Sequence, residues 1–235
     1  MVKKAVCLIS GGLDSCVAAH IAKKEGYEIY ALSFNYGQKH KKEIESAKNI
    51  ASTVKAKKHI MFDFDLDKFG SSSLTDKSLS IGKNHSLEEI GKTIPSTYVP
   101  ARNTIFLSIA LAYAEAIDAD AIFIGITATD YSGYPDCRSK YIKAFQKMAD
   151  LATKKGVEGK VIEIKAPLLH MSKADIIKKG LKIGAPIEKT WSCYIGGKKA
   201  CGRCDSCILR LKGFKQAQVR DPIEYEFLPE WYKLR

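Results

Sequence analysis

The 235-residue chain lacks the features of a secreted or membrane-bound protein. Its first ten residues, MVKKAVCLIS, contain neither the long apolar core nor the small-residue cleavage site of a signal peptide. No apolar run approaches the roughly 18 residues that a membrane-spanning helix needs. We therefore expect a soluble, cytoplasmic protein with no membrane partner.

Internal repeats and low-complexity tracts are also absent, which argues against repeat and fibrous architectures. A chain of this length suits one large domain, or one domain with a small appendage. Helical and strand patterns alternate as far as Gly184 and then stop. We expect an α/β domain at residues 1–184 and a small unit at residues 185–235.

Acidic residues are few relative to basic ones: 26 Asp and Glu accompany 38 Lys and Arg, which gives a net charge of +12. Such an excess favours anionic ligands such as nucleotides, phosphates, carboxylates or RNA. Most of the lysines are scattered, however, and scattered lysines are typical of a solvated surface rather than of a nucleic-acid footprint. We therefore expect no stable nucleic-acid partner.

Short apolar segments alternate with segments of helical periodicity. The spacing predicts strands at 5–9, 28–34, 59–64, 121–125 and 161–164, and helices at 13–24, 41–54, 103–117, 141–152 and 172–181. This alternation indicates βαβ units, hence a mostly parallel sheet with helices on both faces. Ser172 and Asp175 have the spacing of a capping box.

Residues 67–98 interrupt the alternation with a stretch rich in Ser, Gly and Lys. A loop this long in a compact domain is usually functional or mobile. Two interpretations stay open: a lid beside the functional site, and a tolerated surface insertion.

Neither of two common phosphate-binding signatures is present, G-x-x-x-x-G-K-[ST] or G-x-G-x-x-G. Instead SGGLDS, residues 10–15, lies at the first strand–helix junction. Unpaired helix N–H groups and the helix dipole favour an anion there. The glycines let the backbone approach a phosphate, and the serines can donate hydrogen bonds to it. Asp14 would repel a bare phosphate, which predicts Mg²⁺ between them. A glycine turn that only caps the helix is the alternative.

Four of the seven cysteines lie close together late in the chain. Cys193 precedes a C-x-x-C-x-x-C run formed by Cys201, Cys204 and Cys207. Clustered cysteines in a cytosolic protein indicate metal binding or catalysis before disulfides. Four thiolates can surround one zinc ion and leave no open position, so a structural site is expected. An iron–sulfur cluster and a reactive thiol pair are the alternatives.

SGGLDS resembles the pyrophosphate-binding PP-loop of the ATP pyrophosphatase superfamily, whose members adenylate a substrate. The resemblance implies an open five-stranded parallel sheet of the adenine nucleotide alpha hydrolase-like kind. ATP is then expected at the carboxyl ends of the strands, where open α/β sheets bind ligands. The implied ATP contacts are Ile9, Ser10, Gly11, Gly12, Leu13, Asp14, Ser15, Cys16 and Phe34.

Three further stretches, at 98–115, 125–138 and 166–177, resemble the 7-cyano-7-deazaguanine synthase (QueC) family together with WSCY and CGRCDSC. One departure is Ala101, where many relatives are expected to have glycine. The resemblance implies conversion of 7-carboxy-7-deazaguanine and ammonia to the 7-cyano compound, in queuosine or archaeosine biosynthesis. ATP would activate first the acid and then the amide as adenylates.

The implied catalytic residues are Asp14, Ser15 and Arg102. The implied substrate contacts are Arg102, Asn103, Asp130, Tyr131 and Asp136. Arg102 could instead form a surface ion pair, and the loop around Asp130 could be a structural turn. The chain has no room for a glutaminase domain, so free ammonia is expected. We also expect a homodimer.

Two other functions stay open. A PP-loop enzyme that modifies tRNA, of the thiolase kind, would explain the positive charge. Such an enzyme would normally carry an RNA-binding extension or a catalytic cysteine pair. A non-catalytic, zinc-stabilised nucleic-acid-binding module is the second alternative, and it leaves SGGLDS unexplained.

Overall fold

A computed structural model of the chain describes residues 2–39, 41–90, 92–128 and 134–232. Within these residues, five strands form a single parallel sheet in the order β3-β2-β1-β4-β5. The strands are β1 (Lys4–Leu8), β2 (Glu28–Asn35), β3 (Lys58–Asp63), β4 (Ala121–Phe123) and β5 (Glu163–Lys165). The strand order reverses direction at β1, between β2 and β4, and such a switch point opens a crevice at the carboxyl ends of the strands.

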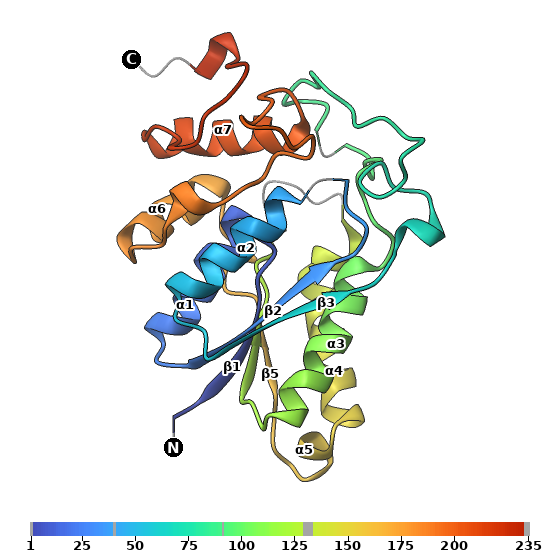
Figure 1. The fold of residues 1–235 in the computed structure, drawn as a ribbon. Coiled ribbons are helices and arrows are strands. Elements are labelled where there is room, and N and C mark those ends of the chain that lie inside the picture. The colour runs from blue at the N-terminus through green and yellow to red at the C-terminus, as the bar shows by residue number, and fades with distance from the viewer. Residues whose placement is uncertain (1, 40, 91, 129–133, 233–235) are drawn as a thin grey trace.

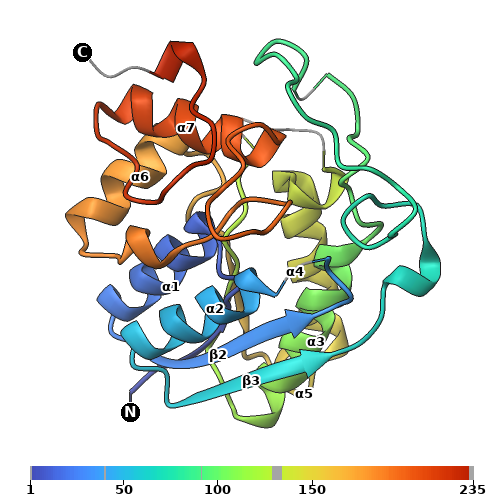
Figure 2. The same ribbon diagram turned by 45° about the horizontal axis from the view of Figure 1, so that its top comes forward.

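Helices cover both faces of the sheet (Figure 1). They are α1 (Leu13–Lys24), α2 (Lys42–Thr53), α3 (Arg102–Ala116), α4 (Ser139–Ala152), α5 (Lys154–Val157), α6 (Lys173–Lys182) and α7 (Asp205–Ala217). The helices α1 and α2 lie on one face, α3 and α4 on the other, and α6 and α7 stack beyond α1 (Figures 1 and 2). The predicted open parallel sheet with helices on both faces is confirmed.

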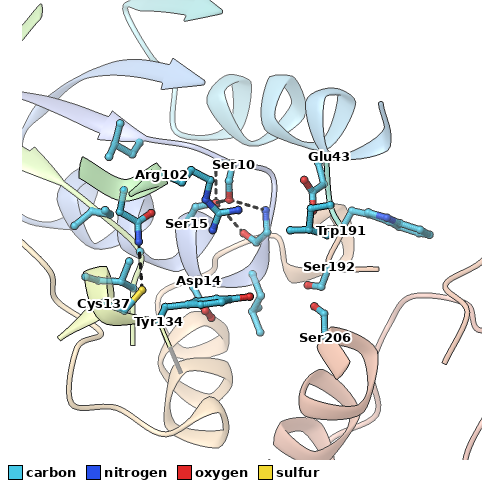
Figure 3. A pocket seen from close by; sticks show the side chains of 18 of the residues that line it. Ser10, Asp14, Ser15, Glu43, Arg102, Tyr134, Cys137, Trp191, Ser192 and Ser206 are labelled. Carbon is cyan, nitrogen blue, oxygen red and sulfur yellow. Dashed lines mark hydrogen bonds between the residues drawn. The ribbon is translucent and has the colours of Figure 1, made fainter. Parts of the chain in front are cut away.

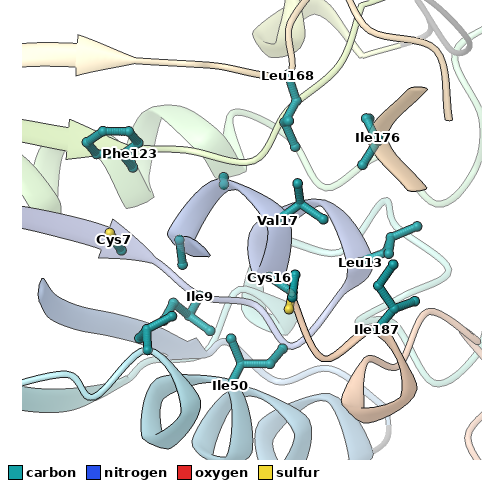
Figure 4. Packing of buried hydrophobic residues seen from close by; sticks show 14 of the residues in the cluster. Cys7, Ile9, Leu13, Cys16, Val17, Ile50, Phe123, Leu168, Ile176 and Ile187 are labelled. Carbon is teal, nitrogen blue, oxygen red and sulfur yellow. The ribbon is translucent and has the colours of Figure 1, made fainter. Parts of the chain in front are cut away.

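The central strand β1 is buried on both sides. Ala5 and Cys7 belong to the core cluster under α1 and α2, and the alternate residues Val6 and Leu8 belong to the cluster under α3. Because successive side chains of a strand point to opposite faces, a strand covered twice must be apolar throughout. Figure 4 shows the first cluster, in which Val17 of α1 packs among residues of the sheet and α6.

Every predicted strand and helix is present, with ends that differ by one or two residues for most of them. The capping box at the start of α6 is confirmed, since Ser172 and Asp175 each bond the other's backbone N–H. In the stretch 67–98, the described residues contain only a short 3-10 turn, Asp67–Phe69. The helix α7 was not predicted. Its apolar residues do not follow one face, because α7 is buried on several sides.

The C-terminal segment packs directly on the α/β layers. Leu211 and Phe214 of α7 lie in the same core cluster as β1 and α1. Gly213 permits this packing, because a Cβ atom there would lie 2.4 Å from Cγ of Lys173 on α6. The division predicted after residue 184 stays a prediction.

A buried ion pair fastens α7 to the tail of the chain. The Arg210 guanidinium donates to both carboxylate oxygens of Asp221, at 2.7 and 3.0 Å. It also donates to the Thr190 hydroxyl at 2.8 Å, and Tyr225 donates to Asp221 at 2.7 Å. The remaining donors and acceptors of this pair are satisfied, so the pair fixes the position of α7 relative to the tail. Removal of one partner would leave an uncompensated buried charge. Among the described helices, none has the length and apolar character needed to cross a membrane.

Ala101, the residue before α3, has φ of 53° and lies in the left-handed region. This conformation costs an alanine about 1 kcal/mol or slightly more, and glycine adopts it freely. We expect Ala101→Gly to raise the free energy of unfolding by up to about 1 kcal/mol and the melting temperature by about 2–4 °C. Ala101→Val should lower both, since a β-branched residue is poorly tolerated there. Thermal unfolding of the three proteins checks this, and a lower melting temperature for the glycine variant would contradict it.

Candidate active site

A cavity of about 290 Å³ opens at the carboxyl ends of β1, β2 and β4. It lies at the switch point of the sheet and is closed on one side by the segment that leads to the cysteine cluster. Seven of the nine residues predicted to contact ATP line this cavity, and Gly11 and Cys16 do not. Cys16 belongs to the first turn of α1 and is buried, and its N–H is already bonded to the Gly12 carbonyl.

The loop 10–15 forms the floor of the cavity (Figure 3). Ser15 Oγ accepts from Ser10 N and Ser10 Oγ, at 3.2 and 3.1 Å, and donates to the Gly12 carbonyl at 3.0 Å. These bonds gather both hydroxyls at the start of α1, which begins at Leu13. The first N–H groups of a helix have no intrahelical acceptor. The loop therefore presents donors and a positive dipole end to an anion.

Gly11 is required by the shape of this turn. It has φ of +89°, and a Cβ atom would lie 2.2 Å from the Glu43 carbonyl oxygen. Its own carbonyl accepts from Ser46 Oγ at 2.8 Å and from Trp191 N at 2.9 Å. A Cβ atom on Gly12 would meet no atom closer than 3.5 Å. The first glycine therefore holds the loop against α2, and the second leaves room for a ligand.

Asp14 does not carry an uncompensated charge. Lys173, the first residue of α6, places its Nζ 2.7 Å from each carboxylate oxygen of Asp14. Both side chains are largely buried, at 16% exposure for Lys173 and 23% for Asp14. The pair brings a lysine directly to the turn formed by residues 10–15.

Arg102 enters the cavity from the first turn of α3. Its Nη1 donates to the Tyr36 hydroxyl at 3.2 Å, and the structure as described gives it no carboxylate partner. Burial works to lower its pKa, but Tyr36, Tyr134 and Tyr194 around it hold the pKa above the usual value. The guanidinium is thus a charged group that a ligand carboxylate or phosphate can pair with.

Asn103 and Asp136 are hydrogen-bonded to each other. The Asp136 carboxylate accepts from the backbone N–H of Asn103 at 3.0 Å, and Asn103 Nδ2 donates to the Asp136 carbonyl and to Cys137 Sγ, both at 3.3 Å. A carboxylate at the first turn of α3 also suits the helix dipole. Asn103 lines the cavity, whereas Asp136 does not. Contact of either with substrate stays a prediction, and the predicted contacts Asp130 and Tyr131 fall outside the described residues.

Phe34, at the end of β2, lines the cavity from within an aromatic cluster. Its ring stacks on Phe106 of α3, with 4.0 Å between centroids and 8° between planes. Only 8% of the residue is exposed. Phe34 therefore has a core role as well as a position at the site.

The four cysteines of the C-terminal cluster converge on one point. Their sulfur atoms all lie within 4.8 Å of one another, and all four residues are buried. The Cys201 and Cys207 sulfurs are 3.9 Å apart. A tetrahedral ion with bonds of about 2.3 Å places its sulfurs about 3.8 Å apart. The cluster can therefore hold one metal ion.

Backbone N–H groups support the thiolate form of Cys193 and Cys201. Cys201 Sγ accepts from the N–H groups of Arg203 and Cys204, at 3.4 and 3.3 Å. Bonds with the neighbouring thiols, and the Arg203 N–H, hold the pKa of Cys201 below its usual value. Trp191 connects the cluster to the cavity, since its indole N–H donates to the Cys193 carbonyl at 3.0 Å.

Sequence reasoning missed Glu43, Lys173 and Trp191, which all line the cavity. Lys173 had a signal, because it opens the helix that follows the last strand and so faces the carboxyl edge of the sheet. Glu43 and Trp191 had none, since the first looks like a solvated helix residue and the second like a core aromatic.

The family model described as "Queuosine biosynthesis protein QueC" matches residues 4–218 of the chain. The chain belongs to the QueC family. This QueC family member is 54% identical over 223 residues to "7-cyano-7-deazaguanine synthase 2" of Desulfitobacterium hafniense (strain Y51), which covers 95% of this chain and 93% of that protein. It is 53% identical over 220 residues to the "7-cyano-7-deazaguanine synthase" of Trichodesmium erythraeum (strain IMS101), covering 94% and 99%. The resemblance predicted from the motifs is confirmed.

Among solved structures, the QueC family chain aligns with NMN synthetase from Francisella tularensis. The alignment has a TM-score of 0.47 and 16% identity, and covers 93% of this chain and 79% of that one.

The cysteine cluster predicts a coupling between metal content and stability. Cys204→Ser should lower both the bound metal per chain and the melting temperature, since binding energy at such a site is folding energy. Metal analysis and thermal unfolding of purified protein measure the two effects. Cys7→Ala is the matched control, because it removes a buried thiol from the sheet and should lower stability without metal loss. Full metal content in the Cys204 variant would count against the site.

Proposed function

We propose that the chain is a 7-cyano-7-deazaguanine synthase that converts 7-carboxy-7-deazaguanine and ammonia to the nitrile at the expense of ATP, in queuosine or archaeosine biosynthesis. One observation carries the proposal: an anion-binding helix start, the Lys173–Asp14 pair and the Arg102 guanidinium all face one cavity. This arrangement suits a nucleotide beside a carboxylate. The reaction itself is inferred from membership of the QueC family, whose curated relatives are 7-cyano-7-deazaguanine synthases.

The loop 10–15 binds the phosphates of ATP in this scheme. Donors at the start of α1 and the ammonium of Lys173 offset the charge of the leaving pyrophosphate. Asp14 is the carboxylate that we propose to hold Mg²⁺ together with the phosphates, and that ion supplies further charge stabilisation. Ser10 and Ser15 donate to phosphate oxygens.

The acid must be activated because a carboxylate repels a nucleophile. Arg102 holds the carboxylate of the substrate beside the α-phosphate, with Asn103, Asp130, Tyr131 and Asp136 as further proposed contacts. Attack of the carboxylate on the α-phosphorus releases pyrophosphate and gives the acyl adenylate. Ammonia then displaces AMP to form the amide. A second adenylation, on the amide oxygen, lets that oxygen leave and yields the nitrile.

We propose that the four cysteines hold zinc in a structural role. Zinc prefers four thiolates in a tetrahedron, and the sulfur separations suit one ion. An iron–sulfur cube binds each thiolate to a different iron and would spread the sulfurs further. Four protein ligands leave no position for a substrate.

In this proposal free ammonia serves as the nitrogen donor, and the protein acts as a homodimer without a stable nucleic-acid partner. Residues 185–235 form a small zinc-binding subdomain packed on the α/β layers. The cytoplasm suits the reaction, because it supplies ATP and keeps cysteine thiols reduced.

A single nucleotide site must serve both activations. The amide, supplied with ATP and no ammonia, should therefore be converted to the nitrile. Asp14→Asn should slow this conversion and that of the acid alike, by at least about 100-fold, because both use the same phosphates. Mass analysis of the products measures both rates. Asp118→Asn, at an exposed turn beyond α3, is the control and should leave both rates unchanged. Loss of acid conversion alone would contradict the single site.

Arg102→Lys tests the contact with the carboxylate. The lysine keeps the charge but not the planar fork, so a bidentate contact is lost. We expect the KM for the acid to rise about 10-fold or more, with little change in melting temperature. Steady-state kinetics measure this, and Arg220→Lys on the exposed tail is the control. An unchanged KM would remove Arg102 from the substrate site.

A further inference from the structure

Glu43, the second residue of α2, places a carboxylate in the cavity. It is partly buried, and the described part of the chain gives its carboxylate no ion pair or hydrogen bond. Trp191 and Arg102 line the same cavity, and Figure 3 draws all three side chains there. The cavity thus contains an unpaired carboxylate as well as an unpaired guanidinium.

The surroundings of Glu43 allow it to change protonation state. Burial raises the pKa of Glu43 to about 7, although Arg102 across the cavity lowers it in part. Tyr36, at the end of β2, also lies within its electrostatic reach. A group that titrates near neutral pH can both accept and return a proton.

The proposed reaction needs a proton acceptor for nitrogen. Ammonia is mostly ammonium at neutral pH, and ammonium has no lone pair with which to attack. The nitrile forms only after the amide nitrogen has lost both of its protons. A cationic lysine or arginine cannot accept these protons, and Asp14 is already bonded to Lys173. None of the described histidines lines the cavity.

We propose that Glu43 is the general base that removes protons from the attacking and product nitrogen, an inference that rests on the proposed function. In the first half-reaction, ammonium transfers a proton to the Glu43 carboxylate. The nitrogen lone pair forms the C–N bond at the acyl adenylate, the C–O bond to AMP breaks, and AMP leaves with that electron pair. The proton left on nitrogen passes to solvent, and Glu43 gives up its own before the next step.

In the second half-reaction, the amide oxygen attacks the α-phosphorus of ATP and pyrophosphate leaves. Glu43 then takes a proton from nitrogen, and the freed electron pair builds the C–N multiple bond. The C–O bond breaks, AMP leaves, and the second N–H proton is lost to solvent. The carboxylate acts at nitrogen in both halves, whereas formation of the adenylates involves no nitrogen proton and does not require it.

The test separates adenylation from proton transfer. Glu43→Gln keeps the size of the side chain but removes the base, and Glu45→Gln changes an exposed glutamate on the same helix as a matched control. With the acid and without ammonia, exchange of labelled pyrophosphate into ATP should stay within about threefold of wild type in both variants. With ammonium present, nitrile formation should fall at least about 100-fold in Glu43→Gln only.

A neutral nucleophile gives a second measurement. Hydroxylamine is largely unprotonated at neutral pH, so Glu43→Gln should form the hydroxamate from the acyl adenylate at close to the wild-type rate. Glu43→Ala should in turn recover part of its nitrile formation when formate is added as a small external base. This second variant keeps the test decisive if the glutamine substitution disturbs folding.

The outcomes distinguish this inference from the proposed function. If the wild-type protein makes no nitrile, the proposed function fails. If Glu43→Gln makes nitrile within threefold of wild type, or loses pyrophosphate exchange as severely as nitrile formation, the general-base role is overturned. Failure of both hydroxylamine and formate to restore product would also overturn it.

Discussion

Two groups meet at the carbonyl oxygen of Gly11: the Ser46 hydroxyl from α2, which is shared with the Lys189 carbonyl, and the backbone N–H of Trp191. The bonds are 2.8 and 2.9 Å long, and they join three segments that are far apart in the chain. A side chain at Gly11 would collide with α2, so this junction exists only with glycine. Through it the loop 10–15 is aligned with α2, which carries Glu43, and with the segment that enters the cysteine cluster. The geometry of the cavity depends on this alignment.

Charge in the cavity depends on a few side chains rather than on the overall excess of basic residues. Lys173 offsets Asp14, and three tyrosines surround Arg102. Desolvated charges without partners are costly, and they are retained where a ligand supplies the missing partner. The net charge of +12, which first indicated anionic ligands, therefore says less about the site than these three side chains do.

The sequence predicts most of the layers and part of the site. Strands buried on both faces appear in the sequence as apolar runs. SGGLDS and the cysteine spacing are short-range patterns, so they can be recognised from the sequence alone. Contacts between distant residues are not encoded this way: Lys173 and Asp14 are separated by 159 positions. Glu43 occupies a polar position of an amphipathic helix, so its pattern is that of a solvated residue. The helix α7 was missed because Arg210, buried at 2% exposure, breaks the apolar periodicity.

The close approach of α6 and α7 at Gly213 affects how the protein unfolds. The aliphatic stem of Lys173 packs against α7 at this glycine, and α7 begins directly after Cys204 of the cysteine cluster. The ammonium that bonds Asp14 therefore belongs to a side chain that packs on α7, the helix that follows the cysteine cluster. If the cysteine cluster unfolds, α7 loses its packing against Lys173. The core that Phe214 shares with α1 is then exposed to solvent. Heat or denaturant should consequently melt the two ends of the chain in one cooperative transition.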